Sequence, residues 1–146
     1  MLRGIPSILS PELLKVLMEM GHGDEIVLAD GNFPSKTCGQ RVVRCDGHGI
    51  PELLNAILPL FPLDVEYSQY PAALMQLTPG DSYQPVIWEE YDRVFAANPD
   101  GRPALEQVER FAFYERAKKA FAVVATGESA LYANLILKKG VVKEEE

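Results

Sequence analysis

Apolar residues recur along this chain at two different spacings, which separate the expected helices from the expected strands. Helical spacing begins at Ser10, Pro11 and Glu12, a hydroxyl, a proline and an acid that together are typical of a helix start. We expect helices over 11–20, 50–58 and 86–97, and one or two more within 105–119. Gly21 is expected to end the first helix with a positive φ angle.

Short apolar runs between these helices predict buried strands. The expected strands lie at 26–29, 40–45, 73–77, 121–126 and 131–137. Alternation of strands and helices predicts one layered α/β domain over residues 1–146, with a charged tail at 138–146.

Charge and composition exclude several classes of function. A net charge of −7 argues against a protein that binds nucleic acid or anionic membrane. No apolar run is long enough for a membrane span, and the N-terminus does not resemble a secretion signal. We therefore expect a cytoplasmic protein in which Cys38 and Cys45 remain free thiols. No metal site is expected, because the sequence has no zinc pattern such as Cys-x-x-Cys and only two histidines, His22 and His48.

The stretch from Met20 to Pro34 carries the most distinctive polar residues. The imidazole of His22 has an ordinary pKa of about 6.5, which suits proton transfer near neutral pH, although His22 could equally cap the preceding helix. Asp30 follows a buried strand, where it could accept hydrogen bonds from a ligand or hold an Asx turn. The sequence leaves open whether the fold brings these two side chains together.

Two other pairs of residues are expected to share a face. Tyr132 and Asn134 lie two positions apart in an expected strand, and Arg110 and Tyr114 lie four positions apart in an expected helix. Each pair could bind a sugar or belong to an ordinary protein surface. Glycine-rich phosphate loops and a nucleophile elbow are absent from the sequence, so nucleotide-binding and serine-hydrolase chemistry are not indicated.

Several of these motifs together resemble one known family. Gly21-His22-Gly23-Asp24, the segment 29–34 and Tyr132-Ala133-Asn134 resemble the signature of the fucose mutarotase and ribose pyranase family, RbsD/FucU. The segment 109–116 is more similar to the fucose branch than to the ribose branch, and the likeness extends over 2–139.

The resemblance implies a fold, an activity and an assembly. The fold would be a three-layer α/β/α domain with a mainly parallel sheet, and the subunits would form pentameric rings or decamers. The activity would be the interconversion of the α and β anomers of a free monosaccharide, L-fucose above all, without a cofactor. His22 would be the general acid/base. The implied substrate contacts are Asp30, Asp64, Met75, Arg110, Tyr114, Tyr132 and Asn134.

The residues are compatible with this chemistry. Mutarotation removes a proton from the anomeric hydroxyl and delivers one to the ring oxygen, and a well-placed imidazole typically accelerates such steps by about 10²–10⁴-fold. Three alternatives stay open: a D-ribose pyranase, a sugar-binding protein without activity, and a structural ring protein. The preferred sugar, the ring size and a contribution of a neighbouring subunit to the pocket are also left open.

Overall fold

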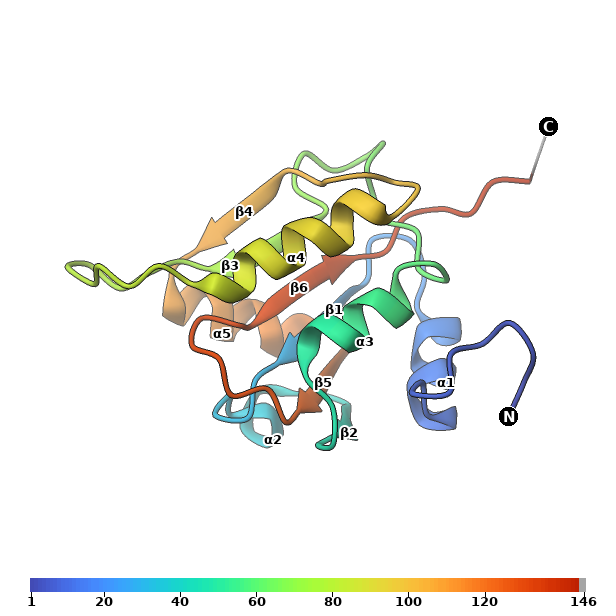
Figure 1. The fold of residues 1–146 in the computed structure, drawn as a ribbon, viewed down its shortest axis with the longest axis horizontal. Helices are drawn as coiled ribbons and strands as arrows, with labels where there is room; N and C mark the ends of the chain where they lie inside the picture. Colours follow the sequence, from blue (N-terminus) through green and yellow to red (C-terminus); the bar gives the residue numbers. More distant parts are fainter. Residues whose placement is uncertain (145–146) are drawn as a thin grey trace.

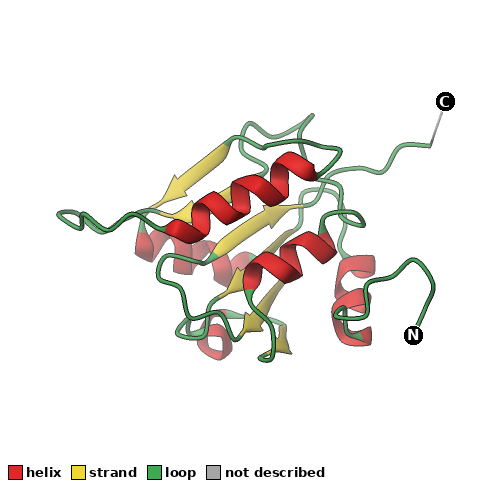
Figure 2. Ribbon diagram, viewed as in Figure 1, coloured by secondary structure: helices red, strands yellow, loops and turns green. Residues whose placement is uncertain are grey.

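The computed structural model describes residues 1–144, which form a central sheet covered by helices on both faces (Figures 1 and 2). The six strands of the described chain are β1 (Glu25–Ala29), β2 (Val42–Cys45), β3 (Ala72–Met75), β4 (Leu105–Val108), β5 (Ala122–Thr126) and β6 (Leu135–Lys138). Their order across the sheet is β2-β5-β1-β6-β3-β4. The expected three-layer α/β fold is therefore confirmed.

Most strand pairs are parallel, as expected. Strands β2, β5 and β1 form one parallel set, and β3 and β4 form another. Strand β6 lies between the two sets and runs antiparallel to both β1 and β3. The carboxyl ends of the parallel strands therefore meet the amino end of β6 at one edge of the sheet.

Two apolar cores hold the helices against the sheet. Helices α1 (Pro11–Glu19), α3 (Ile50–Ile57) and α4 (Val86–Ala97) share one core, and α2 (Ser35–Cys38) and α5 (Arg110–Lys119) share the other. Successive strand residues point to opposite faces, so Ile26 and Leu28 enter the first core while Val27 and Ala29 enter the second. This explains why β1 is an uninterrupted apolar run.

The segment 105–119 differs from the expected one or two helices. Its first part is the strand β4, which pairs with β3 along the edge of the sheet, and only its second part is helical. Glu109 separates the two parts, because its carboxylate accepts the backbone N–H groups of Phe111 and Ala112 at 3.0 Å each and so caps α5.

Two local expectations about backbone conformation are wrong. Helix α1 ends at Glu19 with Met20 extended, and the positive φ angle falls on Gly23, at 86°, rather than on Gly21. The strand expected at 131–137 begins only at Leu135, and Tyr132 has a left-handed backbone with φ 57°. The four-residue helix α2 lies in a segment for which the sequence predicted no helix.

None of the helices within residues 1–144 is both long enough and apolar enough to cross a lipid bilayer.

Candidate functional site

One cavity of about 360 Å³ opens where the carboxyl ends of β1, β3 and β4 meet the amino end of β6. It gathers six of the eight site residues expected from the sequence. These six are Asp30, Met75, Arg110, Tyr114, Tyr132 and Asn134. Segments far apart in the chain thus supply a carboxylate, a guanidinium, two phenols and an amide to one space.

Asp30 and Asn134, which both line this cavity, are joined by a hydrogen bond. The Asp30 backbone N–H donates to Asn134 Oδ1 at 2.8 Å, and Asp30 Oδ1 accepts the Asn32 N–H at 3.0 Å. Asp30 is therefore both an Asx-turn residue and a residue of the cavity wall, so the two interpretations of this residue are compatible.

The electrostatic environment of Asp30 disfavours its charged form. Burial raises the pKa of Asp30, and the negative charge of Glu128 raises it further. Hydrogen bonds from the backbone of Asn32 and Phe33 and from Asn134 oppose this effect only in part.

Arg110 and Tyr114 form a second wall, on helix α5. Arg110 Nε donates to the Tyr114 hydroxyl at 3.0 Å, as their spacing along one helix face allows. The Tyr114 ring also meets Phe33 edge-on, with 5.6 Å between ring centroids. Phe33 and Leu131, which the sequence did not single out, give the cavity an apolar side together with Met75.

Tyr132 belongs to the cavity although it is not in a strand. The Trp88 indole N–H donates to the Tyr132 carbonyl at 2.8 Å, and the buried Tyr91 hydroxyl donates to the Ala133 carbonyl. These contacts from α4 hold the backbone in the conformation that directs both Tyr132 and Asn134 to the cavity. Tyr132 and Asn134 were expected to share a face because they would lie in one strand. They do line the same cavity, but the contacts from α4, and not a strand, bring them there.

Thr78 and Asp81 are among the polar residues of the cavity that the sequence did not indicate. Both lie in the loop between β3 and α4, and both contact the Tyr132 hydroxyl. The Thr78-Pro79-Gly80-Asp81 stretch reads as an ordinary turn, and nothing in it signals a partner 51 positions away.

His22 and Asp64, the other two expected site residues, form a separate pair. His22 Nε2 lies 3.1 Å from Asp64 Oδ1, with the His22 side chain 44% exposed and that of Asp64 only 6% exposed. Tyr67 meets the imidazole edge-on at 5.0 Å between centroids. The capping role considered for His22 is filled by Lys139, whose Nζ donates to the carbonyls of Leu17 and Met20 at the end of α1.

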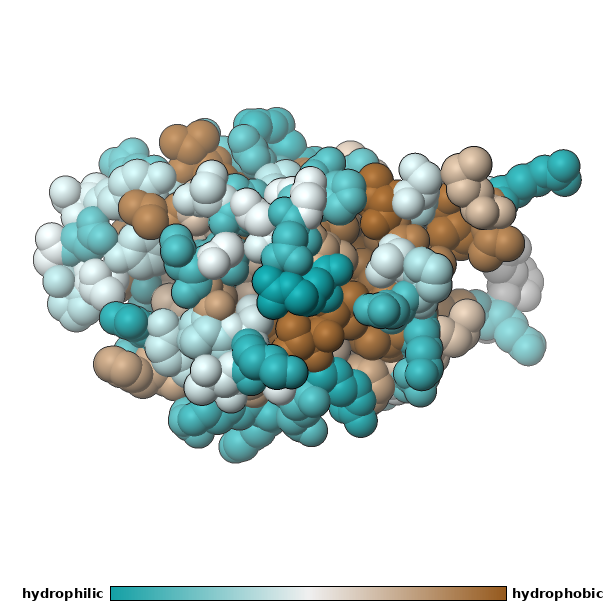
Figure 3. Space-filling view, turned by 90° about the horizontal axis from the view of Figure 1, so that it is seen from below, coloured by the Kyte–Doolittle hydropathy of each residue, from teal (hydrophilic) through white to brown (hydrophobic). Residues whose placement is uncertain are grey.

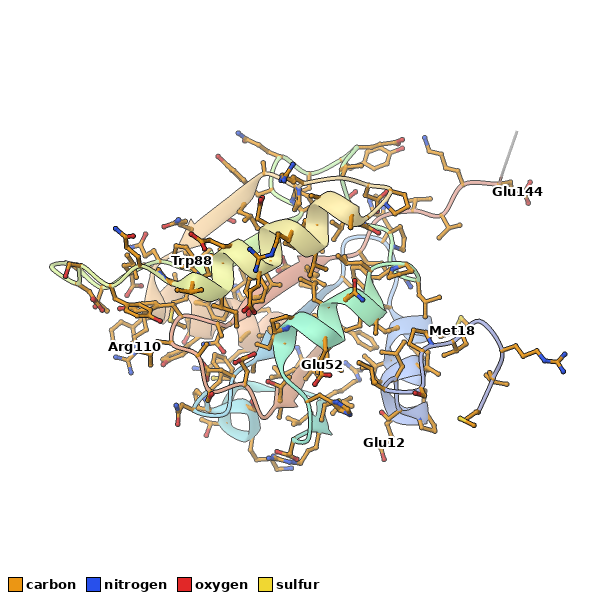
Figure 4. All side chains as sticks on the ribbon, viewed as in Figure 1. Glu12, Met18, Glu52, Trp88, Arg110 and Glu144 are labelled. Carbon is orange, nitrogen blue, oxygen red and sulfur yellow. The ribbon has the colours of Figure 1, made fainter. Side chains whose placement is uncertain are left out.

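This histidine–aspartate pair does not reach the cavity within one chain. His22 precedes β1 and Asp30 follows it, and the five residues of β1 span about 13 Å between their first and last Cα atoms. In Figure 4, Arg110 of the cavity lies on the left side of the molecule, and Met18 of α1, the helix that precedes His22, lies on the right side. One copy therefore carries a sugar-sized cavity at one end and a paired imidazole at the other.

The described residues contain no group of three or more His, Cys, Asp or Glu side chains arranged to hold a metal ion. The chemistry available at both ends of the sheet is that of carboxylates, phenols, an amide, a guanidinium and an imidazole.

Comparisons with known proteins agree on one family. Residues 3–142 match the model of the RbsD / FucU transport protein family. The chain is 59% identical to the fucose mutarotase of Danio rerio over 99% of this chain and 97% of that protein, and 57% identical to that of Homo sapiens over 97% and 94%. It is 52% identical to the L-fucose mutarotase of Actinobacillus pleuropneumoniae over 97% of each chain.

Solved structures give the same result. The fucose mutarotase of Streptococcus pneumoniae in complex with L-fucose superposes with a TM-score of 0.92 at 52% identity, covering 97% of this chain and 100% of that one. The Bacillus subtilis RbsD complexed with D-ribose has a TM-score of 0.76 at 21% identity, covering 98% and 100%, which establishes a shared fold alone.

Proposed function

Because this chain belongs to the RbsD / FucU family, we propose that it is a mutarotase that interconverts the α and β anomers of L-fucose. The observation that carries the proposal is the grouping of six polar and apolar side chains, expected from the sequence, in one cavity of about 360 Å³. Relatives that share more than half of their residues with this chain are fucose mutarotases, which favours this activity over that of a ribose pyranase.

The cavity has the mixed lining that a 6-deoxy sugar requires. Asp30, Asn134, Arg110, Tyr114 and Tyr132 together supply acceptors and donors for the hydroxyl groups of a sugar. Met75, Phe33 and Leu131 offer an apolar wall to the methyl group of fucose. The two features together would orient the ring.

We assign the proton transfer to His22, oriented by Asp64. A carboxylate can only accept a hydrogen bond, so the short contact at 3.1 Å favours a proton on Nε2 and leaves Nδ1 free as a base. The base takes the proton of the anomeric hydroxyl, and the C1–O5 bond breaks as the C1 carbonyl forms. O5 receives a proton from the imidazolium, directly or through a water molecule, which restores the neutral imidazole. Rotation about C1–C2 and the reverse sequence give the other anomer.

This assignment requires a second copy of the chain, because His22 and the cavity lie at opposite ends of β1. We propose that the His22 end of one subunit docks against the cavity of the next. Exposed apolar residues support contacts at both ends, with Val65 and Tyr67 beside His22 and Phe111 and Leu131 beside the cavity. Apolar side chains also gather on the middle and right of the face in Figure 3, the side on which Figure 1 has α1.

A head-to-tail contact generates a ring when the rotation between neighbouring subunits closes. We therefore propose a homo-oligomer, a pentameric ring or a decamer of two such rings. We also propose a cytoplasmic location, which the free thiols of Cys38 and Cys45 support.

Exchange NMR between the two anomers of L-fucose tests the activity. The wild-type protein should accelerate exchange, and His22→Ala should lower the rate about 10²-fold or more, as loss of a general base does. His48→Ala is the matched control, because His48 pairs with exposed Glu52 in a turn, at 3.1 Å, outside the cavity.

Each alternative has its own result in this experiment. Binding of fucose without faster exchange would indicate a sugar-binding protein, and faster exchange of D-ribose than of L-fucose would indicate a ribose pyranase. An unchanged rate in His22→Ala would remove His22 from the mechanism.

A further inference from the structure

The loop between β3 and α4 projects from the end of the molecule that holds the cavity (Figure 1). Its residue Asp81 contacts Tyr132 directly: the Tyr132 hydroxyl donates to Asp81 Oδ2 at 2.6 Å. The other oxygen, Asp81 Oδ1, accepts the Tyr83 backbone N–H at 2.9 Å. One oxygen of the carboxylate thus binds the cavity wall, and the other binds the backbone of the loop itself.

The same loop also restrains the rest of the Tyr132 side chain. The Tyr83 ring stacks on the Tyr132 ring, with 6.1 Å between centroids and 23° between planes. Thr78 places its backbone N–H 3.3 Å and its hydroxyl 3.1 Å from the Tyr132 oxygen. We refer to Thr78, Asp81 and Tyr83 as the loop clamp.

The clamp acts on a residue whose backbone is already fixed from the other side. Tyr132 is the one residue other than glycine with a positive φ in the described chain, and Trp88 of α4 holds its carbonyl. A left-handed backbone is costly for a side chain of this size, so it persists where the surroundings determine it. Backbone and ring are therefore held by different elements, α4 and the loop.

We propose that Asp81 is a positioning residue for sugar binding, which accepts the hydrogen bond of the Tyr132 hydroxyl and so leaves the phenol oxygen as an acceptor for a sugar hydroxyl. This inference rests on the proposed role of the cavity in binding the substrate. The O–H···O⁻ bond to Asp81 is short and charge-assisted, so the Tyr132 hydroxyl donates its hydrogen bond to Asp81 and not to the sugar. Two groups of Thr78 also face the phenol oxygen: its N–H is far, at 3.3 Å, and its hydroxyl, at 3.1 Å, can rotate to another acceptor. A sugar hydroxyl can therefore replace the Thr78 hydroxyl as the donor to the Tyr132 oxygen.

The ionisation of Asp81 agrees with this geometry. The Tyr132 hydroxyl and the Tyr83 amide hold the pKa of Asp81 below its usual range, so the carboxylate is charged at neutral pH. A charged acceptor also polarises the phenol, which makes its oxygen a better acceptor in turn.

Steady-state exchange of L-fucose, measured by NMR at several sugar concentrations on the full chain, tests the role of Asp81. Asp81→Ala should raise KM about three- to tenfold, the value of one hydrogen bond, with kcat nearly unchanged. Asp81→Asn should keep KM close to that of the wild type, because the amide oxygen still accepts the phenol proton. Tyr83→Leu removes only the stacking and should raise KM to a smaller extent.

A double-mutant cycle with Tyr132→Phe separates positioning from a direct contact. In that background Asp81→Ala should change KM by less than about twofold, because its partner hydroxyl is gone. Ser82→Ala, the neighbouring loop residue, is the control for general loop disturbance, and thermal unfolding should give similar midpoints for all variants.

Three outcomes would overturn the inference: an unchanged KM in Asp81→Ala, its full effect persisting in Tyr132→Phe, or an equal effect of Ser82→Ala. A normal KM in Tyr132→Phe itself would instead reject the proposed substrate contact of Tyr132, and the role of Asp81 with it.

Discussion

At Asp30, stability and binding make opposite demands on one carboxyl group. The charged form is the better acceptor for sugar hydroxyls, but burial raises the pKa of Asp30 in the folded protein. A raised pKa means that the folded state binds the proton more tightly than the unfolded state. The stability that protonated Asp30 contributes is therefore present at acidic pH and is lost as pH rises through its folded pKa.

Asp30→Asn should make the folded protein more stable at neutral pH and weaken its binding of L-fucose. At neutral pH the variant should be more stable than the wild type in urea unfolding, and the gain should vanish in acid, where Asp30 of the wild type is neutral. Its affinity for L-fucose should fall about tenfold or more, the value of a hydrogen bond to a charged group.

Asp46→Asn is the control, because its effect on stability at neutral pH should be the opposite of that of Asp30→Asn. The Arg44 guanidinium holds the pKa of Asp46 below its usual range, so removing that charge should lower stability at neutral pH rather than raise it. A less stable Asp30→Asn protein at neutral pH would show that the hydrogen bonds of the carboxylate outweigh its burial.

The residue types at the site could be found from the sequence, but their contacts could not. Asp30 was recognisable as a residue at the end of a strand, and both of its possible roles proved compatible. His22 was ambiguous because its alternative, capping α1, depended on Lys139, which reaches the Leu17 carbonyl from 122 positions away. Asp81 gave no local signal at all, because its partner is defined only by the fold.

At the scale of elements, local patterns located most helices and strands and failed where a distant element decides the conformation. The expected helices over 50–58 and 86–97 correspond closely to α3 and α4. The residues of β4 become a strand because β3 offers them an edge, and Tyr132 leaves the expected strand because α4 binds its carbonyl. Neither influence is visible within the segments themselves.

Helix α5 is also held in place by long-range contacts, which come from a charged residue on its surface, Arg116. Arg116 donates Nε to Glu25 Oε1 at 3.0 Å and Nη2 to Glu25 Oε2 at 2.6 Å, and Nη1 to Glu106 Oε2 at 2.6 Å. This network joins α5 to the start of β1 and to β4, and the Arg116 and Glu25 side chains are only 21% and 17% exposed. The same helix carries Arg110 and Tyr114 to the cavity.

Arg116→Met should therefore destabilise the protein by about 3 kcal/mol, toward the lower limit for removing one partner of a buried pair. Urea unfolding measures this change. Arg102→Met is the matched control: its pair with Asp92 is 61% and 53% exposed, and it should cost less than about 1 kcal/mol. An equal loss of unfolding free energy in the two variants would mean that the network around Glu25 stabilises the protein no more than an exposed ion pair does.

At the scale of the whole molecule, the dominant feature is the length of β1 between His22 and the cavity. The sequence places His22 and Asp30 only eight positions apart, which suggests a compact site, but the intervening strand is extended and keeps them at opposite ends. This separation could be seen only once the residues between them were known to form a strand rather than a fold-back.

The proposed sharing of the site between subunits predicts complementation. His22→Ala and Asp30→Ala should each interconvert the anomers of L-fucose poorly. When subunits of the two variants are unfolded and refolded together, activity should return, because some interfaces in the mixed oligomer combine an intact His22 with an intact cavity. Refolding each variant alone and mixing afterwards is the control. Absence of recovery in mixed oligomers of confirmed composition would contradict a shared site.

The position of β6 has a consequence for how the protein is made. The last strand of the described chain lies in the interior of the sheet, paired on one side with β1 and on the other with β3. Until it is present, the nascent chain has two separate half-sheets, each with an exposed edge that can pair with other chains. The sheet can thus close only once the residues of β6 are available, and truncation just before Leu135 should prevent folding as fully as truncation before β5 does.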